Sequence, residues 1–484
     1  MIGVFHLLSQ ATGWLAVATF LPAGIAFATG DRLAGNAYLL VAVMLGFLSG
    51  ALILALRGRR RGLSRVGSYI LILAMWLTIP PIAAIPLTLS GDVGYLTALF
   101  ETVSGLTTTG ASAIPSVSII GPAGVFFRAE LQWLGGFLTL VTVATVLAAT
   151  GLGGLSRSQV ALVSGVEDRL ARILTGVRQI FVAYAAVTVL CIVFLILAGI
   201  PPFEAVCIGL ATLSTGGFMP IDGTFADYDN AFANIVVSVF MLVGATSIVW
   251  QRMVVEGRWH LVTRHRESYW VIGTALALGI LYVFAFADPL GTTGATQAHW
   301  ITAGLLTGIS LVTTTGFEAH PGAFIAVPAT LALVLALVGG SGLSTSGGLK
   351  QYRIGALMVL SGLELRRLLY PHSVREPSAG SIPYNLDMMK AILSYLFVSL
   401  LVIMVAMLLL SLSLPDFPAA ITATIAAFAN IGPLYAAGWQ DAVTWTPYPE
   451  FEPFAKMVMI VTMILGRLEV LVVFAAFNLS YWRS

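Results

Sequence analysis

Residues 310–320 read SLVTTTGFEAH, with three threonines and a glycine at the end of an apolar run. One such cluster predicts no more than a polar turn, because glycine and hydroxyl residues are common in turns. The pattern recurs, however, as GLTTTGA at 105–111, TLSTGGF at 212–218 and FANIGPL at 428–434. We align the four copies on Gly110, Gly216, Gly316 and Gly432, which follow one another at intervals of roughly a hundred residues.

Each cluster follows a short apolar segment and lies between two much longer ones. In the gaps 91–122 and 200–230 the short segment has about ten to twelve residues, too few to span a bilayer but typical of a re-entrant helix. Non-helical backbone at membrane depth must be buried in protein or line a cavity. Because an internal repeat dictates architecture, we expect four tandem units of helix, pore helix, filter loop and helix.

The composition predicts an all-α polytopic membrane protein. Of the 484 residues 58% are hydrophobic and 10% are charged, whereas soluble domains carry about 25% charged residues. We expect ten transmembrane helices, near 11–30, 36–56, 66–90, 123–150, 178–199, 231–250, 269–287, 324–362, 388–414 and 454–478. These divide the chain into two extra N-terminal helices (1–65) and four pore repeats around one pseudo-fourfold axis, at 66–156, 157–257, 258–375 and 376–484.

Basic residues follow every second span, which predicts a multi-pass protein with both termini cytoplasmic. They are Arg57, Arg59, Arg60, Arg61, Arg65, Arg157, Arg169, Arg172, Arg178, Arg252, Arg258, Arg264, Arg266, Lys350, Arg353, Arg366, Arg367 and Arg375. The opposite loops are acidic, for example at Asp92, Asp222 and Glu450, and would concentrate cations at the outer mouth. An equally good explanation of these acidic loops is that they merely lack lysine and arginine, with no role in concentrating cations.

Four pore helices entering from the outside would point their partially negative C-termini at a central cavity, which favours a cation there. The carbonyls of the following loops would then replace its hydration shell. The expected ion-binding residues are Thr108, Thr109, Gly110, Thr215, Gly216, Thr314, Thr315, Gly316, Asn430, Ile431 and Gly432. The fourth copy keeps its glycine and lacks the threonines, so backbone carbonyls are the shared element and hydroxyls are secondary.

From about residue 66 to the C-terminus the chain resembles the Trk, Ktr and HKT superfamily of potassium transporters. The resemblance includes the four filter segments, RAELQWLGGF at 128–137, GGSGLSTSGGLK at 339–350 and GRLEVL at 466–471. The two extra N-terminal helices make it more similar to the TrkH-type pore subunit than to the eight-helix Ktr pore. This implies potassium uptake across the bacterial inner membrane. In that superfamily serine at the first filter position goes with sodium transport, so Gly110 implies K⁺. The filter loops are simpler than the TVGYG type, so a looser selectivity is expected that admits Rb⁺ and some Na⁺.

The residues also suggest where the pore closes. Arg467 lies near the middle of the last span, where a charge costs at least about 2.5–3.5 kcal/mol. GGSGLSTSGGLK interrupts the eighth span with five glycines, each costing a helix about 1 kcal/mol against alanine. We expect an unwound gating loop over 339–350, the alternative being a small-residue helix-packing seam. The resemblance implies that Arg467 and this loop obstruct ion passage beneath the filter, through Gly340, Ser341, Gly342, Ser344, Thr345, Ser346, Gly347 and Lys350.

Partners follow from the resemblance and from the charge pattern. GLGGLS at 151–156 has no βαβ context, so the chain itself is expected to bind no nucleotide. The resemblance implies a pore homodimer with a cytosolic TrkA-like ring of nucleotide-binding regulatory subunits on its basic loops. Those loops would equally suit anionic membrane lipids, and nothing indicates nucleic acid.

Two other functions are weighed against a pore. An intramembrane hydrolase would need a base beside Ser341, Ser344 or Ser346, and the histidines fall at the N-terminus or in loops and span ends, so no enzyme is expected. A secondary carrier coupling potassium or sodium to another ion would predict two inverted halves rather than four parallel units. Glu101 and Glu204, in the short apolar segments, are expected either to support the filter from behind or to line the outer vestibule. Arg128, Glu130 and Gln132 at the start of the fourth span are expected to close a polar network there, in which Glu130 has no assigned role.

Overall fold

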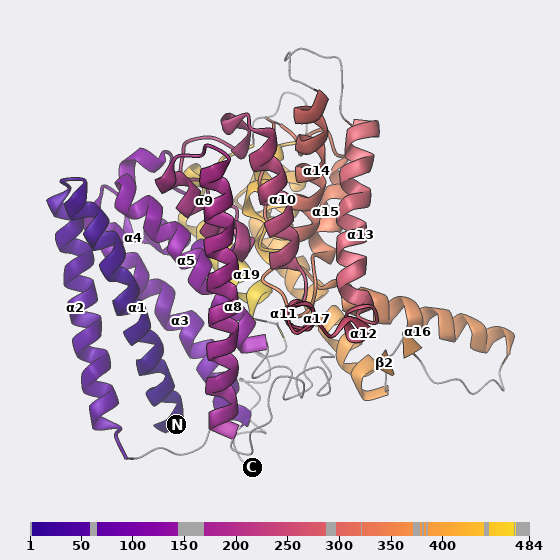
Figure 1. The fold of residues 1–484 in the computed structure, drawn as a ribbon, viewed down its shortest axis with the longest axis horizontal. Helices are drawn as coiled ribbons and strands as arrows, with labels where there is room; N and C mark the ends of the chain where they lie inside the picture. The colour runs from indigo at the N-terminus through magenta and orange to yellow at the C-terminus, as the bar shows by residue number, and fades with distance from the viewer. Residues whose placement is uncertain are drawn as a thin grey trace.

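The computed structural model describes residues 2–58, 65–143, 169–286, 297–320, 322–370, 378–379, 382–383, 386–439, 445–468 and 470, and these form a bundle of helices (Figure 1). Several predictions lie outside the described residues: GLGGLS at 151–156, the ends of the spans 123–150 and 454–478, and charged residues such as Arg59, Arg157 and Arg375.

The helices repeat the predicted order of long helix, short helix, loop and helix four times. The units consist of α3 (Arg65–Ser90), α4 (Tyr95–Leu106) and α5 (Gly121–Thr142); α8 (Arg169–Leu197), α9 (Pro202–Ser214) and α10 (Ala231–Ala245); α13 (Arg266–Leu281), α14 (Gln297–Thr313) and α15 (Ala329–Val338); and α17 (Leu386–Leu410), α18 (Phe417–Phe428) and α19 (Pro453–Arg467). We call α4, α9, α14 and α18 the pore helices.

Contacts between the units close them into a ring. Each pore helix packs against a helix of its own unit and against the last helix of the unit before it: α4 against α19, α9 against α5, α14 against α10, and α18 against α15. Because the first unit thereby meets the fourth, the chain order 1-2-3-4 is also the order around the axis. This is the arrangement that the sequence repeat predicts.

Two further helices, α1 (Ile2–Ala28) and α2 (Arg32–Ala55), pack against each other at one edge of the bundle (indigo in Figure 1). They cover α3 and α5 through an apolar cluster in which the ring of Tyr38 meets that of Phe127 edge-on at 5.2 Å. Asp31 caps α2, its carboxylate accepting from the amide of Ala34 at 3.0 Å. They stand outside the ring of four units, as expected for the extra N-terminal pair.

Six helices in the described part of the chain are long and apolar enough to cross a membrane: α1, α2, α3, α8, α13 with the start of the π-helical η5 (Tyr282–Phe286), and α17. At the remaining four predicted spans the structure has α5, α10, α15 and α19. Two of these predictions were wrong in detail. The span 231–250 is broken, because α10 and α11 (Ile248–Val255) are bent by 107° at Thr246–Ser247.

The span 324–362 is not one helix either. α15 ends at Val338, residues 339–350 are non-helical, and α16 (Gln351–Leu369) then runs crosswise out of the bundle (Figure 1). The glycines of 339–350 explain the break, since each lowers helix stability. Continuous-helix packing, the alternative for this stretch, is therefore wrong, and the predicted unwound loop is confirmed.

The connections between these helices hold further described elements. They contain α12 (Trp259–Val262), the 3-10 turns η1 (Val117–Ile120), η4 (Phe225–Tyr228), η6 (Gly432–Ala437) and η7 (Tyr448–Glu450), and the antiparallel strand pair β1 (Ser378–Ala379) and β2 (Ile382–Pro383) with Ala379 opposite Ile382. The strand pair lies between α16 and α17, so it does not alter the helical architecture of the ring.

Candidate functional site: four loops in a ring and a loop beneath them

All four pore helices end in the same turn. The residue after the helix end adopts the left-handed conformation, with φ of 55° at Thr108, 53° at Thr215, 59° at Thr314 and 54° at Asn430. Its amide donates to the carbonyl three residues earlier at 2.8–3.3 Å, and the next amide donates to the carbonyl five residues earlier at 2.8–3.0 Å. This pair of bonds is the Schellman motif that ends many helices.

The residue type in this turn is unusual. Glycine normally takes the left-handed position, and a β-branched residue there is a rare outlier. Three of the four copies nevertheless place threonine there. Such strain costs of order 1–3 kcal/mol, persists only where surrounding structure enforces it, and gathers at functional sites. We therefore take the four turns as the centre of the site.

The shared turn corrects the alignment of the second copy. Because Thr215 corresponds to Thr108, Gly216 takes the place of Thr109, and Gly217 takes the place of Gly110. The backbone angles agree, since Gly110, Gly217 and Gly316 have φ of 76°, 79° and 87°. The predicted central glycine, Gly216, was therefore displaced by one residue from the true repeat position.

The four loops that follow, 108–110, 215–217, 314–316 and 430–432, are called the filter loops. A Cβ on the glycine of each would lie within 3 Å of the next loop in the ring or of the residue that follows that loop: Gly110 against Gly216, Gly217 against Thr315, Gly316 against Pro433, and Gly432 against Ala111. The amide of Gly432 also donates to the carbonyl of Thr109 at 2.6 Å, which joins the last loop to the first. Glycine is therefore required because neighbouring loops touch. This reason is separate from the crowding that a side chain would cause in a narrow pore.

The ring offers oxygen atoms in a buried environment. The hydroxyl of Thr108 and the amide oxygen of Asn430 are buried and have no hydrogen-bond partner among the described residues. The carbonyl ends of four helices converge here, so the local field favours positive charge. No cluster of histidine, cysteine or acidic residues suited to a tightly held metal occurs in the described chain. A weakly held, oxygen-coordinated monovalent cation fits this donor set.

A buried ion pair supports the first filter loop. Glu101 on α4 and Arg128 on α5 approach to 3.1 Å between Oε2 and Nε, with 0% and 4% of their side chains exposed. The other oxygen of Glu101 accepts from the Ser112 hydroxyl at 2.9 Å and from the amides of Ala113 and Ile114 at 2.6 and 3.2 Å. Glu101 thus holds the chain that leaves the filter. Of its two expected places, it takes the one that supports the filter from behind.

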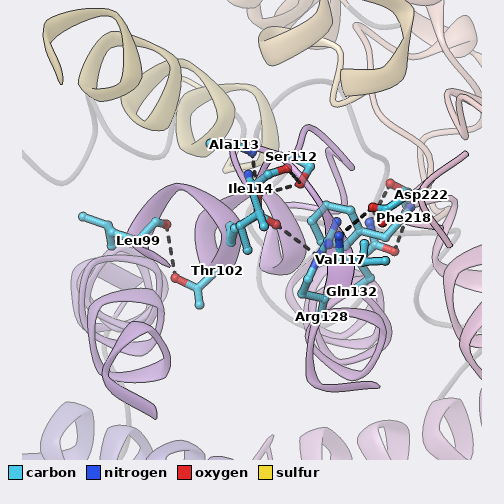
Figure 2. Close-up of polar contacts among 12 residues, drawn as sticks. Leu99, Thr102, Ser112, Ala113, Ile114, Val117, Arg128, Gln132, Phe218 and Asp222 are labelled. Carbon is cyan, nitrogen blue, oxygen red and sulfur yellow. Dashed lines mark hydrogen bonds and ion pairs between the residues drawn. The ribbon is translucent and has the colours of Figure 1, made fainter. Parts of the chain in front are cut away.

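The same face of α5 reaches the second filter loop. Gln132, one turn after Arg128, donates from Nε2 to the carbonyl of Gly216 at 2.6 Å and accepts from the amide of Phe218 at 3.3 Å. The Arg128 guanidinium lies 4.0 Å above the Phe218 ring. Figure 2 shows Arg128, Gln132 and Phe218 grouped beside Ser112–Ile114. Arg128 and Gln132 therefore link filter loops one and two.

Glu130 and Glu204 do not belong to this support. Glu130 is two residues from Arg128 and so points to a different face of α5. It is buried, and its Oε2 has no hydrogen-bond partner among the described residues. Glu204 lies in the first turn of α9, at the opposite end from the filter turn, which favours the outer-vestibule alternative for this residue.

Arg128→Met is predicted to lower stability sharply. The substitution leaves the Glu101 carboxylate buried without its ion partner, which costs about 3–5 kcal/mol. The melting temperature in detergent should fall by several degrees. Arg367→Met is the matched control, because it removes an exposed pair with Glu364 that contributes little. Equal melting temperatures for the two variants would contradict the supporting role.

The unwound loop at residues 339–350, which we call the gating loop after its predicted role, lies against the ends of three pore helices. The Thr345 hydroxyl donates to the carbonyl of Leu213 at 3.0 Å, at the end of α9. The amide of Gly347 donates to the hydroxyl of Thr314, the left-handed residue after α14, at 2.7 Å. A Cβ on Gly347 would lie within 3 Å of the carbonyl of Ala429, after α18. The loop therefore lies beneath the filter and is buried throughout.

Two cations accompany the loop. Arg467 on α19 is 7% exposed, its Nε donates to the Thr139 hydroxyl at 2.8 Å, and its Nη1 lies 3.5 Å from the carbonyl of Ser346. Lys350 donates to the same Ser346 carbonyl. Both line a hollow under the filter together with Gly347 and Gly466. Of the other predicted gate residues, Ser346 lines this hollow and Gly340 lies beside Ser346, whereas Ser341 and Gly342 are not among the lining residues. Ser344 bonds to the Ser341 carbonyl and the Ser346 hydroxyl and so connects the two parts of the loop.

Glycines let the outer helices approach the pore helices closely. Gly135 on α5, Gly244 on α10 and Gly466 on α19 each stand where a Cβ would lie within 3 Å of a pore-helix carbonyl, at Leu106, Leu213 and Phe428 respectively. Two of these glycines belong to the stretches RAELQWLGGF and GRLEVL. Their role is close backbone packing behind the filter.

Comparison with known proteins places this geometry in a family. The TrkH model, described as a cation transport protein, matches residues 48–262 and 274–482. The Trk system potassium uptake protein TrkH of Salmonella typhimurium is 28% identical over 436 residues, covering 87% of this chain and 86% of that protein. The Trk system potassium uptake protein TrkI of Halomonas elongata is 29% identical over 420 residues, covering 86% and 84%.

A solved structure agrees with the fold. The crystal structure of the potassium transporter TrkH from Vibrio parahaemolyticus superposes with a TM-score of 0.87 at 25% identity, over 100% of this chain and 99% of that one. The family match extends over most of the chain and includes all four filter loops, the gating loop and Arg467. The chain is therefore a member of the TrkH family of cation transport proteins.

Proposed function

We propose that this protein carries potassium into the bacterial cell through the ring of four filter loops. The observation that carries the proposal is the fourfold Schellman turn, with each filter loop in contact with the next. Helix C-termini and inward-held carbonyls suit a monovalent cation that must enter and leave readily. The relatives named above are potassium uptake proteins, so transport rather than catalysis is their common activity.

The transported ion is K⁺, and Rb⁺, its close chemical analogue, is accepted as well. The proposed ion-binding set is Thr108, Thr109, Gly110, Thr215, Gly216, Gly217, Thr314, Thr315, Gly316, Asn430, Ile431 and Gly432, with Gly217 added because it takes the repeat position of Gly110. The pore repeats keep their proposed bounds of 66–156, 157–257, 258–375 and 376–484, after the N-terminal pair at 1–65. No nucleotide binds this chain itself.

Arg467 and the gating loop form the gate. The loop crosses the inner ends of three pore helices, and two positive side chains meet at the Ser346 carbonyl within it. A potassium ion leaving the filter would face both cations in a medium of low permittivity, where their repulsion is strong. Opening therefore requires the loop, Arg467 or both to move aside.

The proposed setting is the bacterial inner membrane, with both termini in the cytoplasm. The chain acts as a homodimer with a cytosolic TrkA-like nucleotide-binding regulatory subunit. Exposed basic residues such as Arg258 and Arg264, between α11 and α13, and Arg266, at the start of α13, give that subunit, or anionic membrane lipids, a surface to contact. No contact with nucleic acid is proposed.

Ion flux in liposomes tests the function. Purified protein should take up ⁸⁶Rb⁺ from outside without any gradient of sodium or protons, and excess K⁺ should suppress the uptake more than excess Na⁺. Protein-free liposomes give the background rate. Uptake that depends strictly on a sodium or proton gradient would instead favour the coupled carrier, and a rate equal to the background would contradict potassium transport.

A further inference from the structure

We propose that Glu267 is the positioning residue that anchors the gating loop in its obstructing place. The inference rests on the proposed gating role of residues 339–350 and adds the element that holds them. Glu267 lies in the first turn of α13, in the repeat that also contains the loop. Its Oε1 accepts from the Ser341 hydroxyl at 2.7 Å and from the amide of Gly342 at 2.5 Å.

The chemistry of these two bonds makes them strong. Hydrogen bonds to a carboxylate are shorter and about twice as strong as bonds between neutral groups. Ser341 is 0% exposed, so its hydroxyl and the neighbouring amide would otherwise lack a partner in a dry environment. The carboxylate is also favoured at the N-terminus of α13, where the helix dipole is positive. The loop therefore depends on a charge supplied from its own repeat.

The loop is held at two separate places. Its second half, around Ser346 and Gly347, meets the filter, Arg467 and Lys350. Its first half joins the break between α10 and α11, through the amides of Ser341 and Thr345 to the carbonyls of Ala245 and Gly244. Glu267 is the side chain that holds this first half, so its loss should weaken the anchoring there to the backbone bonds alone, without touching the groups that contact the ion.

The position of Glu267 also connects the gate to the cytoplasmic side. Residues 252–266, which include α12, precede Glu267 and form a basic segment. Ser268, which follows Glu267, accepts a hydrogen bond at its hydroxyl from the amide of Ser247 at 3.4 Å. A displacement of this segment would move Glu267 together with the start of α13. Glu267 is therefore where a cytoplasmic regulator would release the loop.

Glu267→Ala should raise the ⁸⁶Rb⁺ flux of the full-length protein in liposomes about tenfold, because two charge-assisted bonds to the loop are lost. Glu267→Gln keeps an uncharged acceptor and should raise the flux less. The half-saturating Rb⁺ concentration and the Rb⁺ to Na⁺ flux ratio should stay at the parent values, which a general loss of packing would not allow. Glu256→Ala is the matched control, since this exposed carboxylate pairs with Arg252 and Arg258 and does not reach the loop.

A second measurement follows the loop itself. With Cys191 and Cys207 replaced by alanine, a Leu343→Cys variant is labelled by a water-soluble maleimide, and Glu267→Ala should increase the labelling rate severalfold. Unchanged flux and labelling in a parent that transports Rb⁺ would overturn the anchor and leave the proposed function intact. A parent without Rb⁺ flux would contradict the proposed function, and the labelling rate alone would then decide whether Glu267 anchors the loop.

Discussion

Replacing Arg467 with alanine is expected to increase potassium flux about 30-fold. For a separation of about 8 Å between the guanidinium and a passing potassium ion, and an effective permittivity of about 20, the two unit charges repel by about 2 kcal/mol. A barrier lower by about 2 kcal/mol corresponds to a rate higher by about 30-fold. Arg467 is buried, and its Nε and Nη1 bond to Thr139 and approach Ser346 beneath the filter. Removing the guanidinium therefore removes a positive barrier and one tie between α19 and the gating loop.

Initial ⁸⁶Rb⁺ uptake into liposomes at matched protein content measures this effect. Arg467→Lys keeps the positive charge and should stay within a few-fold of the parent, which separates the charge from the shape of the side chain. Thr139→Val is a further control, because it removes the hydroxyl to which Arg467 Nε donates and leaves the charge in place. Unchanged flux in Arg467→Ala, with intact expression and folding, would count against the gate.

The repeat architecture could be predicted from the sequence because each of its elements has a characteristic length and composition. Long and short apolar segments alternate in a fixed order, and TTTG-like clusters mark the end of each short one. Helix-breaking glycines likewise located the unwound stretch at 339–350, and the family resemblance supplied its expected gating role. These features are local, so no knowledge of distant contacts was needed to find them.

The exact register of the second filter loop could not be predicted in the same way. TLSTGGF contains two adjacent glycines, and the usual preference for glycine in a left-handed turn points to Gly216 as the turn residue. The structure instead places Thr215 in that conformation, in common with Thr108 and Thr314. The hydrogen bonds that end α9 and the backbone φ angles of the loop distinguish the two registers, and both depend on the packing around the ring.

Contacts between residues far apart in the sequence could not be predicted either. Glu101 and Arg128 looked like separate polar residues of adjacent helices, and their ion pair depends on how α4 and α5 cross. Glu267 is an unremarkable charge at a helix start in the sequence, and the loop it contacts lies 74 residues later. No periodic pattern encodes such contacts, so the supporting groups of the site emerge only from the fold.

Gly110→Ser is expected to reduce the ratio of potassium to sodium flux about tenfold. The backbone at Gly110 has φ of 76°, where a side chain costs roughly 1–2 kcal/mol, and the new Cβ would lie within 3 Å of the Gly216 carbonyl. The second filter loop must then move outward. Because the carbonyls replace the hydration shell of the ion, a displaced carbonyl weakens the preference for K⁺ over the smaller Na⁺.

Parallel ⁸⁶Rb⁺ and ²²Na⁺ uptake in liposomes measures the ratio, and two further variants separate its causes. Gly46→Ser is the matched control, since a Cβ there meets nothing within 4 Å on α2. Gly432→Ala tests close approach without a positive φ, because its Cβ would meet Ala111 of the first loop's chain. If crowding between neighbouring loops sets selectivity, Gly432→Ala should lower the ratio as Gly110→Ser does. Parent-like ratios of potassium to sodium flux in both filter variants would contradict the placement of the filter loops in the ion path.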